Sequence, residues 1–321
     1  MRTITVAVSL TIWLALSTTK ALAQEPAYPP GTGPVVLIDA AHHNVYRAAQ
    51  RASIIEFLEK DGYRVRELLR GRFDRESLDG VQIIIIETAL SAQNALPSNP
   101  PTEAELAEAW RLPTPSAFAP EEITFLSRWV KTGGALLLVF DHMPLAGAAQ
   151  KLAGAFGIEV SNGYAVDERL LGELAPRNVA QAGSLVFRRV DQTLAEHPIT
   201  NGRSATERVD SAATYVGSAF QLPPEGESLL RLGPSFISLL PQVAWQFSDA
   251  TRRESIATWS QGGVLRVERG RVAIFGEHGL LTTPARVAAD SADAGANPQH
   301  QNPQLLLNTL HWLSGLLDES Q

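Results

Sequence analysis

Short, nearly continuous apolar runs recur in the N-terminal part of the chain. Val35–Ile38, Val81–Ile86 and Ala135–Phe140 are runs of this kind, and polar residues follow each of them. A strand that is buried on both faces of a sheet carries this pattern. The segment Tyr63–Leu68 is less apolar, and we expect it to be a further strand of the same sheet.

Helices are expected between and after these strands. Between Asn44, a suitable N-cap, and Gly62, apolar residues recur at three- and four-residue spacing. Pro120 and the two acids after it are typical of a helix start. Two more helices are predicted at Leu145–Phe156 and Leu305–Leu317. Because strands alternate with helices, the sequence predicts an α/β fold with a mostly parallel sheet covered on both faces.

The pattern changes after Gly157. Gly and Pro separate short β-like pieces in a region of about residues 160–262, namely Ser184–Val190, Thr214–Leu222, Ser228–Leu232 and Val243–Phe247. We expect a β-rich elaboration or a small second lobe there, after which a hairpin at Gly263–Phe275 returns to the main sheet. Ser91–Phe118 and Ala288–Gln304 are predicted to be loops on one rim of the sheet, where they can act as lids.

Polar side chains collect where the predicted strands end. These residues are Asp39, His42, His43 and Asn44 after the first run, Glu87 after the third strand, Asp141 and His142 after the fourth, and Glu277 and His278 after the last. In open α/β sheets, ligands bind outside the carboxyl ends of the strands. The sequence therefore predicts a polar pocket at this edge, with Asp141, His142 and Glu277 as catalytic candidates and the others as ligand-binding candidates.

Each of these residues also has a simpler explanation, because a polar residue at a strand end can cap the next helix. Four of the seven histidines lie beside an acid or another histidine at three strand ends, which capping alone does not explain. Imidazole and carboxylate together suit a zinc-like divalent metal, for which His42, His142, His278 and Asp141 are candidate ligands. An Asp–His pair serves equally well as a base and its orienting partner, so both chemistries stay open.

The N-terminus has the features of a secretory signal. Arg2 is followed by the apolar stretch Ile4–Leu16 and by a small-x-small sequence that ends at Ala23. We expect cleavage after Ala23, with a Pro-rich leader at residues 24–33 and one domain at residues 34–321. A periplasmic or secreted protein without a stable membrane span after cleavage is the resulting expectation.

Charge and cysteine content exclude several classes of partner and site. The formal charge is −7, and removal of Arg2 and Lys20 with the signal leaves −9. Such a balance argues against nucleic acid and anionic lipid as partners and favours a small polar molecule or an envelope protein. The chain has no cysteine, which excludes disulfides and thiolate ligands.

Several motifs, taken in order, carry a family resemblance. They are Val36–Asn44, Phe125–Phe140 with its Gly-Gly step into a strand, His197–Ile199, Gly270–Glu277 and Asn308–Leu313. On these motifs the chain resembles the class I glutamine amidotransferase-like superfamily. More narrowly, it resembles exported members of unknown function that are related to the N-terminal domains of gliding-motility transport proteins. The resemblance spans most of the mature chain and implies a flavodoxin-like, three-layer α/β/α sandwich.

Amidotransferase activity does not follow from this resemblance. That activity needs a nucleophilic cysteine after a central strand, where this sequence has Phe140-Asp141-His142. We therefore expect the protein to lack glutaminase activity. The leading hypothesis is a small-ligand-binding protein or a hydrolase, with metal assistance as one form of it. The rival hypothesis is a non-catalytic interaction module of an envelope or transport complex.

Overall fold

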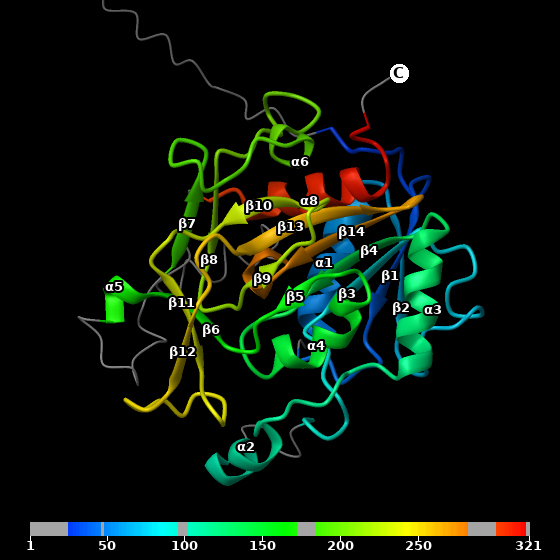
Figure 1. The fold of residues 1–321 in the computed structure, drawn as a ribbon. Helices are drawn as coiled ribbons and strands as arrows, with labels where there is room; N and C mark the ends of the chain where they lie inside the picture. The colour runs from blue at the N-terminus through cyan, green and yellow to red at the C-terminus, as the bar shows by residue number, and fades with distance from the viewer. Residues whose placement is uncertain (1–24, 46–47, 96–101, 172–183, 282–299, 319–321) are drawn as a thin grey trace, which may run out of the picture.

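A nine-stranded sheet forms the centre of the protein (Figure 1). The computed structural model describes residues 25–45, 48–95, 102–171, 184–281 and 300–318. The strand order is β2-β1-β3-β4-β14-β13-β9-β5, with β10 beside β13. The strands are β1 (Val35–Asp39), β2 (Arg64–Leu68), β3 (Ile83–Glu87), β4 (Ala135–Val139), β5 (Glu159–Val160), β9 (Phe220–Gln221), β10 (Glu227–Arg231), β13 (Ser260–Val267) and β14 (Gly270–Phe275).

The sheet is parallel over five strands and antiparallel over the rest. β2, β1, β3, β4 and β14 are parallel neighbours. The pairings among β14, β13, β10, β9 and β5 are antiparallel. β2 is an edge strand, and Arg64, Arg66 and Glu67 on it are exposed. The order of the five parallel strands is that of flavodoxin-like folds, so the predicted α/β class is confirmed.

Helices cover both faces of the sheet because the central strands are apolar on both faces. The four helices that do this are α1 (Ala48–Lys60), α3 (Pro120–Lys131), α4 (Leu145–Gly154) and α8 (Asn302–Leu313). Side chains along β1 alternate between two cores. Ile38 shares one core with Leu58 of α1 and Leu310 of α8. Leu37 shares the other core with Leu126 of α3, which makes the three layers.

The region between α4 and β13 adds two small antiparallel sheets. One has the order β12-β11-β6 and the other pairs β7 with β8. Their strands are β6 (Tyr164–Asp167), β7 (Leu185–Arg188), β8 (Ser211–Thr214), β11 (Phe236–Leu240) and β12 (Arg252–Ser255). Short helical segments are α2 (Glu103–Ala109), α5 (Glu168–Leu171), α6 (Pro198–Asn201) and η2 (His278–Leu281). The β-rich character predicted for this region is therefore present.

Two predicted strands in this region are wrong in detail. The segment Thr214–Leu222 is not one strand, because β8 ends at Thr214 and β9 contains only Phe220 and Gln221. The segment Val243–Phe247 forms no strand and makes one isolated bridge to Arg111. Trp245, in its middle, has a φ of 64°, and an extended strand cannot contain this left-handed conformation.

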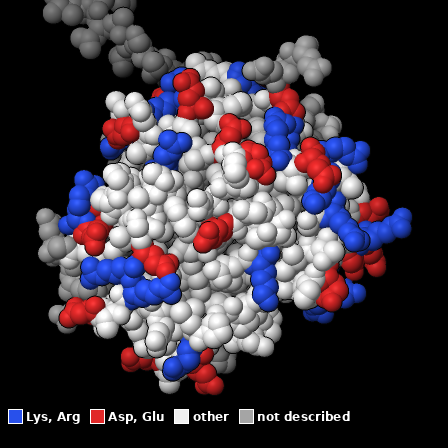
Figure 2. Space-filling model, in the orientation of Figure 1, with Lys and Arg blue, Asp and Glu red and all other residues white. Residues whose placement is uncertain are grey.

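Charged side chains of both signs are interspersed on the face that Figure 2 shows. They lie mainly around its periphery, and its centre is largely uncharged. On the described part of this face, no continuous basic area is visible.

Gly270 provides a test of how α3 packs on the sheet. A Cβ at Gly270 would lie 1.9 Å from the carbonyl oxygen of Val130 in α3, so one of the two backbones must move. We expect Gly270→Ala to lower the free energy of unfolding by about 2–3 kcal/mol, as overpacking does. Urea unfolding, followed by circular dichroism, measures this change in the free energy of unfolding. Gly154→Ala, on a helix with open space around the site, is the control and should be neutral or stabilising by about 1 kcal/mol. Equal effects of the two substitutions would contradict the packing.

Candidate functional site

Three neighbouring parallel strands each bring an acid to the same edge of the sheet. Glu87 is the last residue of β3, Asp141 lies just beyond β4, and Glu277 lies just beyond β14. The pairing of Glu87 with Val139 and of Val139 with Phe275 keeps the three strand ends level. All three acids are buried. The carboxyl ends of the central strands thus carry an acidic site at the edge where open α/β sheets bind ligands.

Asp141 and Glu277 converge on the ring of His278. Nδ1 of His278 lies 2.7 Å from Oδ2 of Asp141 and 3.4 Å from Oε1 of Glu277. The backbone N–H of His142 donates to Oδ1 of Asp141 over 2.7 Å, and the N–H of Gly279 donates to Oε1 of Glu277 over 2.9 Å. One histidine therefore joins the ends of two strands. Asp141, Glu277 and His278 are called the acid–histidine cluster below.

Glycines allow the chain to approach closely around Glu277. A Cβ at Gly276 would lie 2.4 Å from the carbonyl oxygen of Ser218. A Cβ at Gly217 would lie 2.6 Å from Cβ of Glu277. The segment after β8 therefore packs directly on the segment after β14, and Glu277 is enclosed as a result.

Burial and charge have opposing effects on the pKa values of this cluster. Burial raises the pKa of Glu277 to about 7, although the charge of His278 opposes the change. Burial also favours a higher pKa for Asp141, but the charge of His142 and the hydrogen bond from His278 outweigh burial and lower that pKa. Burial disfavours the charged ring of His278, but the hydrogen bond to Asp141 and the charge of Glu277 raise its pKa. The two carboxyl groups therefore differ, because the pKa of Asp141 is lowered while that of Glu277 lies at about 7, so that Glu277 can exchange a proton near neutral pH.

The second carboxyl oxygen of Glu277 is buried without a hydrogen-bond partner in the described part of the chain. An unpaired buried polar group costs about 1–3 kcal/mol. A ligand that donates a hydrogen bond to Oε2, or a cation, would remove this cost. One ligand atom from each of Asp141, Glu277 and His278 lies within 4.8 Å of the others. This nitrogen and carboxylate set suits a divalent transition metal.

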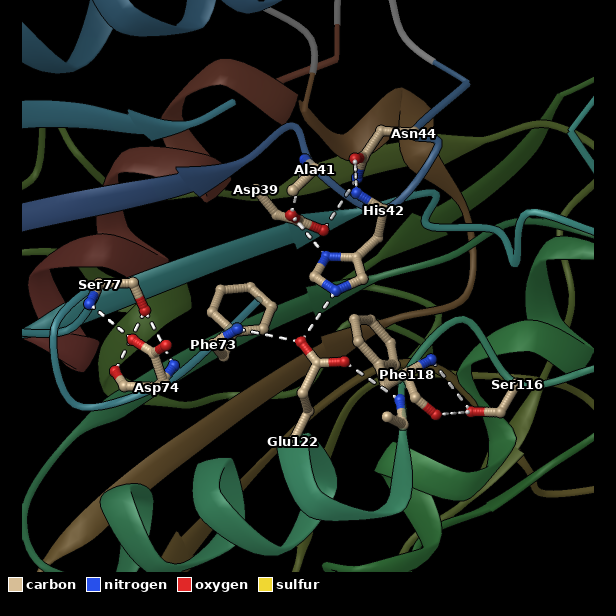
Figure 3. Close-up of polar contacts among 11 residues, drawn as sticks. Asp39, Ala41, His42, Asn44, Phe73, Asp74, Ser77, Ser116, Phe118 and Glu122 are labelled. Carbon is tan, nitrogen blue, oxygen red and sulfur yellow. Dashed lines mark hydrogen bonds and ion pairs between the residues drawn. The ribbon is translucent and has the colours of Figure 1, made fainter. Parts of the chain in front are cut away.

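His42 belongs to a separate cluster at the end of β1 (Figure 3). Its Nδ1 lies 2.8 Å from Oδ1 of Asp39, and its Nε2 lies 3.1 Å from Oε1 of Glu122. The ring stacks on Phe73 at a centroid distance of 5.1 Å and contacts Phe118 at 4.8 Å. Both ring nitrogens therefore have carboxylate partners within the protein, and a metal could bind His42 only by displacing one of them.

Glu122 connects this cluster to the start of α3. Its Oε2 accepts the backbone N–H of Ala119, and its Oε1 accepts the N–H of Phe73 over 3.0 Å (Figure 3). Burial favours a lower pKa for His42, but the hydrogen bonds to Asp39 and Glu122 outweigh burial and raise it to about 9. His42 is therefore a buried imidazolium that links β1 to α3.

His142 lies against aromatic rings. Its ring stacks on Tyr164 at a centroid distance of 4.8 Å and meets Trp245 edge-on at 4.6 Å. Its Nδ1 lies 2.7 Å from the carbonyl oxygen of Met143. A carbonyl only accepts hydrogen bonds, so Nδ1 carries a proton, and in the neutral form of the ring Nε2 is then the acceptor. His142 borders Asp141 in sequence, but it is not in the acid–histidine cluster.

The other predicted residues take different positions around this edge. His43 is exposed and has a φ of 48°. Nδ2 of Asn44 donates to Oδ2 of Asp39 over 3.2 Å and to the carbonyl oxygen of Glu87 over 2.7 Å, which ties β1 to β3. The charge of Glu87 contributes to the raised pKa of His278.

Three residues of these clusters were not identified from the sequence. Glu122 is recognisable only as an acid in the first turn of a helix, and its partner His42 is 80 positions away. Tyr164 and Trp245 lie in the β-rich region, where no local pattern points to the end of β4.

The His42 imidazolium predicts a pH dependence of stability. A pKa raised from 6.5 to about 9 stabilises the fold fully below pH 6.5, and the contribution is lost as pH rises to about 9. The amount lost is about 3 kcal/mol. Urea unfolding at pH 6 and pH 9.5 should show this decrease in the wild type, beyond the decrease in His42→Gln. The exposed-site variant His43→Asn should keep the wild-type pH dependence. An identical pH dependence in wild type and His42→Gln would exclude the charged bridge.

No family model matches the sequence, and no curated protein matches it. Among solved structures, the N-terminal domain of mmIFT52 is similar, with a TM-score of 0.53, 11% identity, and coverage of 89% of this chain and 99% of that chain. A cytoplasmic protein from Salmonella typhimurium LT2 aligns with a TM-score of 0.48, 14% identity, and coverage of 87% of this chain and 98% of that chain. A ThuA-like protein from Bacteroides uniformis aligns with a TM-score of 0.42, 13% identity, and coverage of 91% and 93%.

At sequence identities this low, a structural alignment shows a similar fold and does not indicate a shared activity. The alignment with mmIFT52 extends over nearly all of that domain and most of this chain. This alignment agrees with the α/β fold described above.

Proposed function

We propose that the protein binds a small polar molecule at the acid–histidine cluster and hydrolyses it by proton transfer. The observation that carries this proposal is the convergence of two buried carboxyl groups on one imidazole nitrogen, at 2.7 and 3.4 Å. Groups that are buried together in this way adopt different protonation states, which is what acid–base catalysis requires.

Each member of the cluster has a distinct role in this proposal. Glu277 has a pKa of about 7, so it can accept a proton from the attacking water and return it to the leaving group. The pKa of His278 is raised, and in its protonated form this ring stabilises negative charge that develops on the substrate. Asp141 holds the His278 ring through the 2.7 Å hydrogen bond. His142 offers Nε2 as an acceptor to the same molecule.

A divalent transition metal on Asp141, Glu277 and His278 is the second form of the proposal. Bound there, the metal would act as a Lewis acid and would activate water for attack near neutral pH. The unpaired Oε2 of Glu277 and the mixed nitrogen and oxygen donors support it. In this form, the three side chains bind the metal and His142 contacts the substrate.

We further propose that the protein is exported and belongs to the exported branch that the sequence motifs resemble. The support is the signal-like segment that ends at Ala23, which lies outside the described residues. Over the residues with a described structure, no helix combines the length and the apolar character that a membrane span needs.

Turnover is the direct test of the acid–histidine cluster. The full chain would be assayed with 4-nitrophenyl acetate, 4-nitrophenyl phosphate and 4-nitrophenyl β-glucoside. We expect hydrolysis of at least one of them, and a loss of about 100-fold or more in kcat for Asp141→Asn and for Glu277→Gln, because acid–base groups contribute this much. The exposed-loop variant Glu225→Gln should retain wild-type kcat.

The stability of Glu277→Gln separates a catalytic role from a structural one. Because burial disfavours the ionised carboxylate, metal-free Glu277→Gln should unfold at a higher temperature than wild type at pH 8 and should show no such gain at pH 5. An inactive variant with this stability profile supports catalysis. A wild-type protein that hydrolyses none of the substrates would favour the interaction module instead, whereas a fully active Glu277→Gln variant would contradict the role of Glu277 in proton transfer.

Zinc binding decides between the two forms of the proposal. We expect metal-assisted hydrolysis to show about one zinc per chain after equilibrium dialysis and elemental analysis, with a higher melting temperature that chelator reverses. Asp141→Asn and His278→Gln should abolish this binding, and Glu225→Gln should retain it. If the wild-type chain binds no zinc, the metal-assisted form is excluded and the form in which the side chains alone transfer protons remains.

A further inference from the structure

A cavity of about 250 Å³ lies between the two small antiparallel sheets. Its walls come from β6, α5, β7 and the start of β11, and from the segment after β8. Most of the side chains that line it are apolar, including Ala165, Leu170, Leu185, Val186, Val216 and Phe236. An engineered apolar cavity of about 150 Å³ accommodates benzene, so this one is large enough for a phenyl ring or a short acyl chain.

The cavity is mainly apolar although charged side chains border it. Arg169 lines it, but this arginine makes a two-pronged pair with Asp167, at 2.5 to 3.1 Å. That pair neutralises the charge on this wall, and Arg231, the other arginine of the lining, is exposed. The preferred occupant is therefore an uncharged apolar group.

The segment Tyr215–Gly217 is a wall common to this cavity and the acid–histidine cluster. Tyr215 and Val216 line the cavity. The next residue, Gly217, packs on Glu277, with 2.6 Å between an added Cβ and Cβ of Glu277. On the other side, a Cβ at Gly279 would lie 3.2 Å from the Tyr215 ring. Tyr215 is 44% exposed, so it lies at the surface between the two sites.

From this shared wall we infer that the cavity binds the apolar part of the substrate whose polar group reaches the acid–histidine cluster. The substrate class is a phenyl-sized or short acyl group joined directly to a hydrolysable polar group, such as an aryl or acyl ester or amide. For the polar, reacting group of the substrate, this inference rests on the proposed function. For the apolar group, it rests on the cavity alone.

Two probes distinguish the cavity from its connection to the cluster. Toluene tests whether the apolar cavity binds a phenyl ring. The second probe, 2-phenylacetamide, carries a polar amide on the same ring. Backbone ¹H–¹⁵N spectra of the full chain should show that toluene shifts Leu170 and Val186. We expect 2-phenylacetamide to shift these two and also Gly217 and Gly279. Acetamide alone should bind at least tenfold more weakly than 2-phenylacetamide.

Cavity-filling variants test the location. Val186→Phe and Leu170→Trp lie on walls that are not fully buried, so a larger side chain can enter the cavity without disrupting the core. Each should weaken toluene and 2-phenylacetamide binding at least tenfold. Val190→Phe, at a position that is 83% exposed on the same part of the chain, should bind both probes as wild type does.

The outcomes separate this inference from the proposed function. Wild-type affinity in both filled variants, or no toluene binding to wild type, would overturn the cavity as a binding site. Toluene binding without any effect of 2-phenylacetamide on Gly217 and Gly279 would overturn the connection. If both probes bind as expected and Asp141→Asn leaves hydrolysis unchanged, the proposed chemistry fails while the binding site stands.

Discussion

Burial of the central strands on both faces is the constraint on which the rest of this structure depends. Every residue of β1, β3 and β4 is buried, so helices must cover the sheet on each side. Apolar strands of this kind have no position for a charged group along their length. In such strands an acid fits only at the end, and the buried acids Asp39, Glu87, Asp141 and Glu277 accordingly all lie at one edge.

Two histidines at this edge form hydrogen bonds with buried acids in two different ways. His42 lies between Asp39 and Glu122, and both of its nitrogens are used in holding β1 to α3. His278 holds Asp141, while Glu277 keeps one buried oxygen without a partner in the described residues. A saturated set of hydrogen bonds stabilises a fold, whereas an incomplete set leaves an interaction for another molecule to make. The second arrangement is the one suited to binding.

The sequence was sufficient for the α/β class and for the edge at which the buried acids collect, because both follow from local patterns. The apolar runs identified β1, β3 and β4, and the residues after them were candidates by the geometry of parallel sheets. It was not sufficient for the partners within the site. His42 and Glu122 meet across 80 positions, and no periodicity encodes such a pair. Which imidazole ring, that of His142 or that of His278, bonds to Asp141 depends on the direction of each side chain after its strand, and spacing does not determine this direction. The same limit explains Trp245, whose left-handed φ depends on tertiary packing.

The outer edge of the sheet has a consequence for how copies of the protein behave together. An unpaired edge strand offers its backbone to any other extended chain, and long apolar edges promote aggregation. β2 carries Arg64, Arg66 and Glu67 at this edge, and Arg66 also donates to the carbonyl oxygen of Asp79. At the opposite end, β5 is only two residues long. Charged side chains on β2 and the short length of β5 therefore both disfavour strand pairing between molecules. A fold built around such apolar strands can for this reason remain dispersed at high concentration.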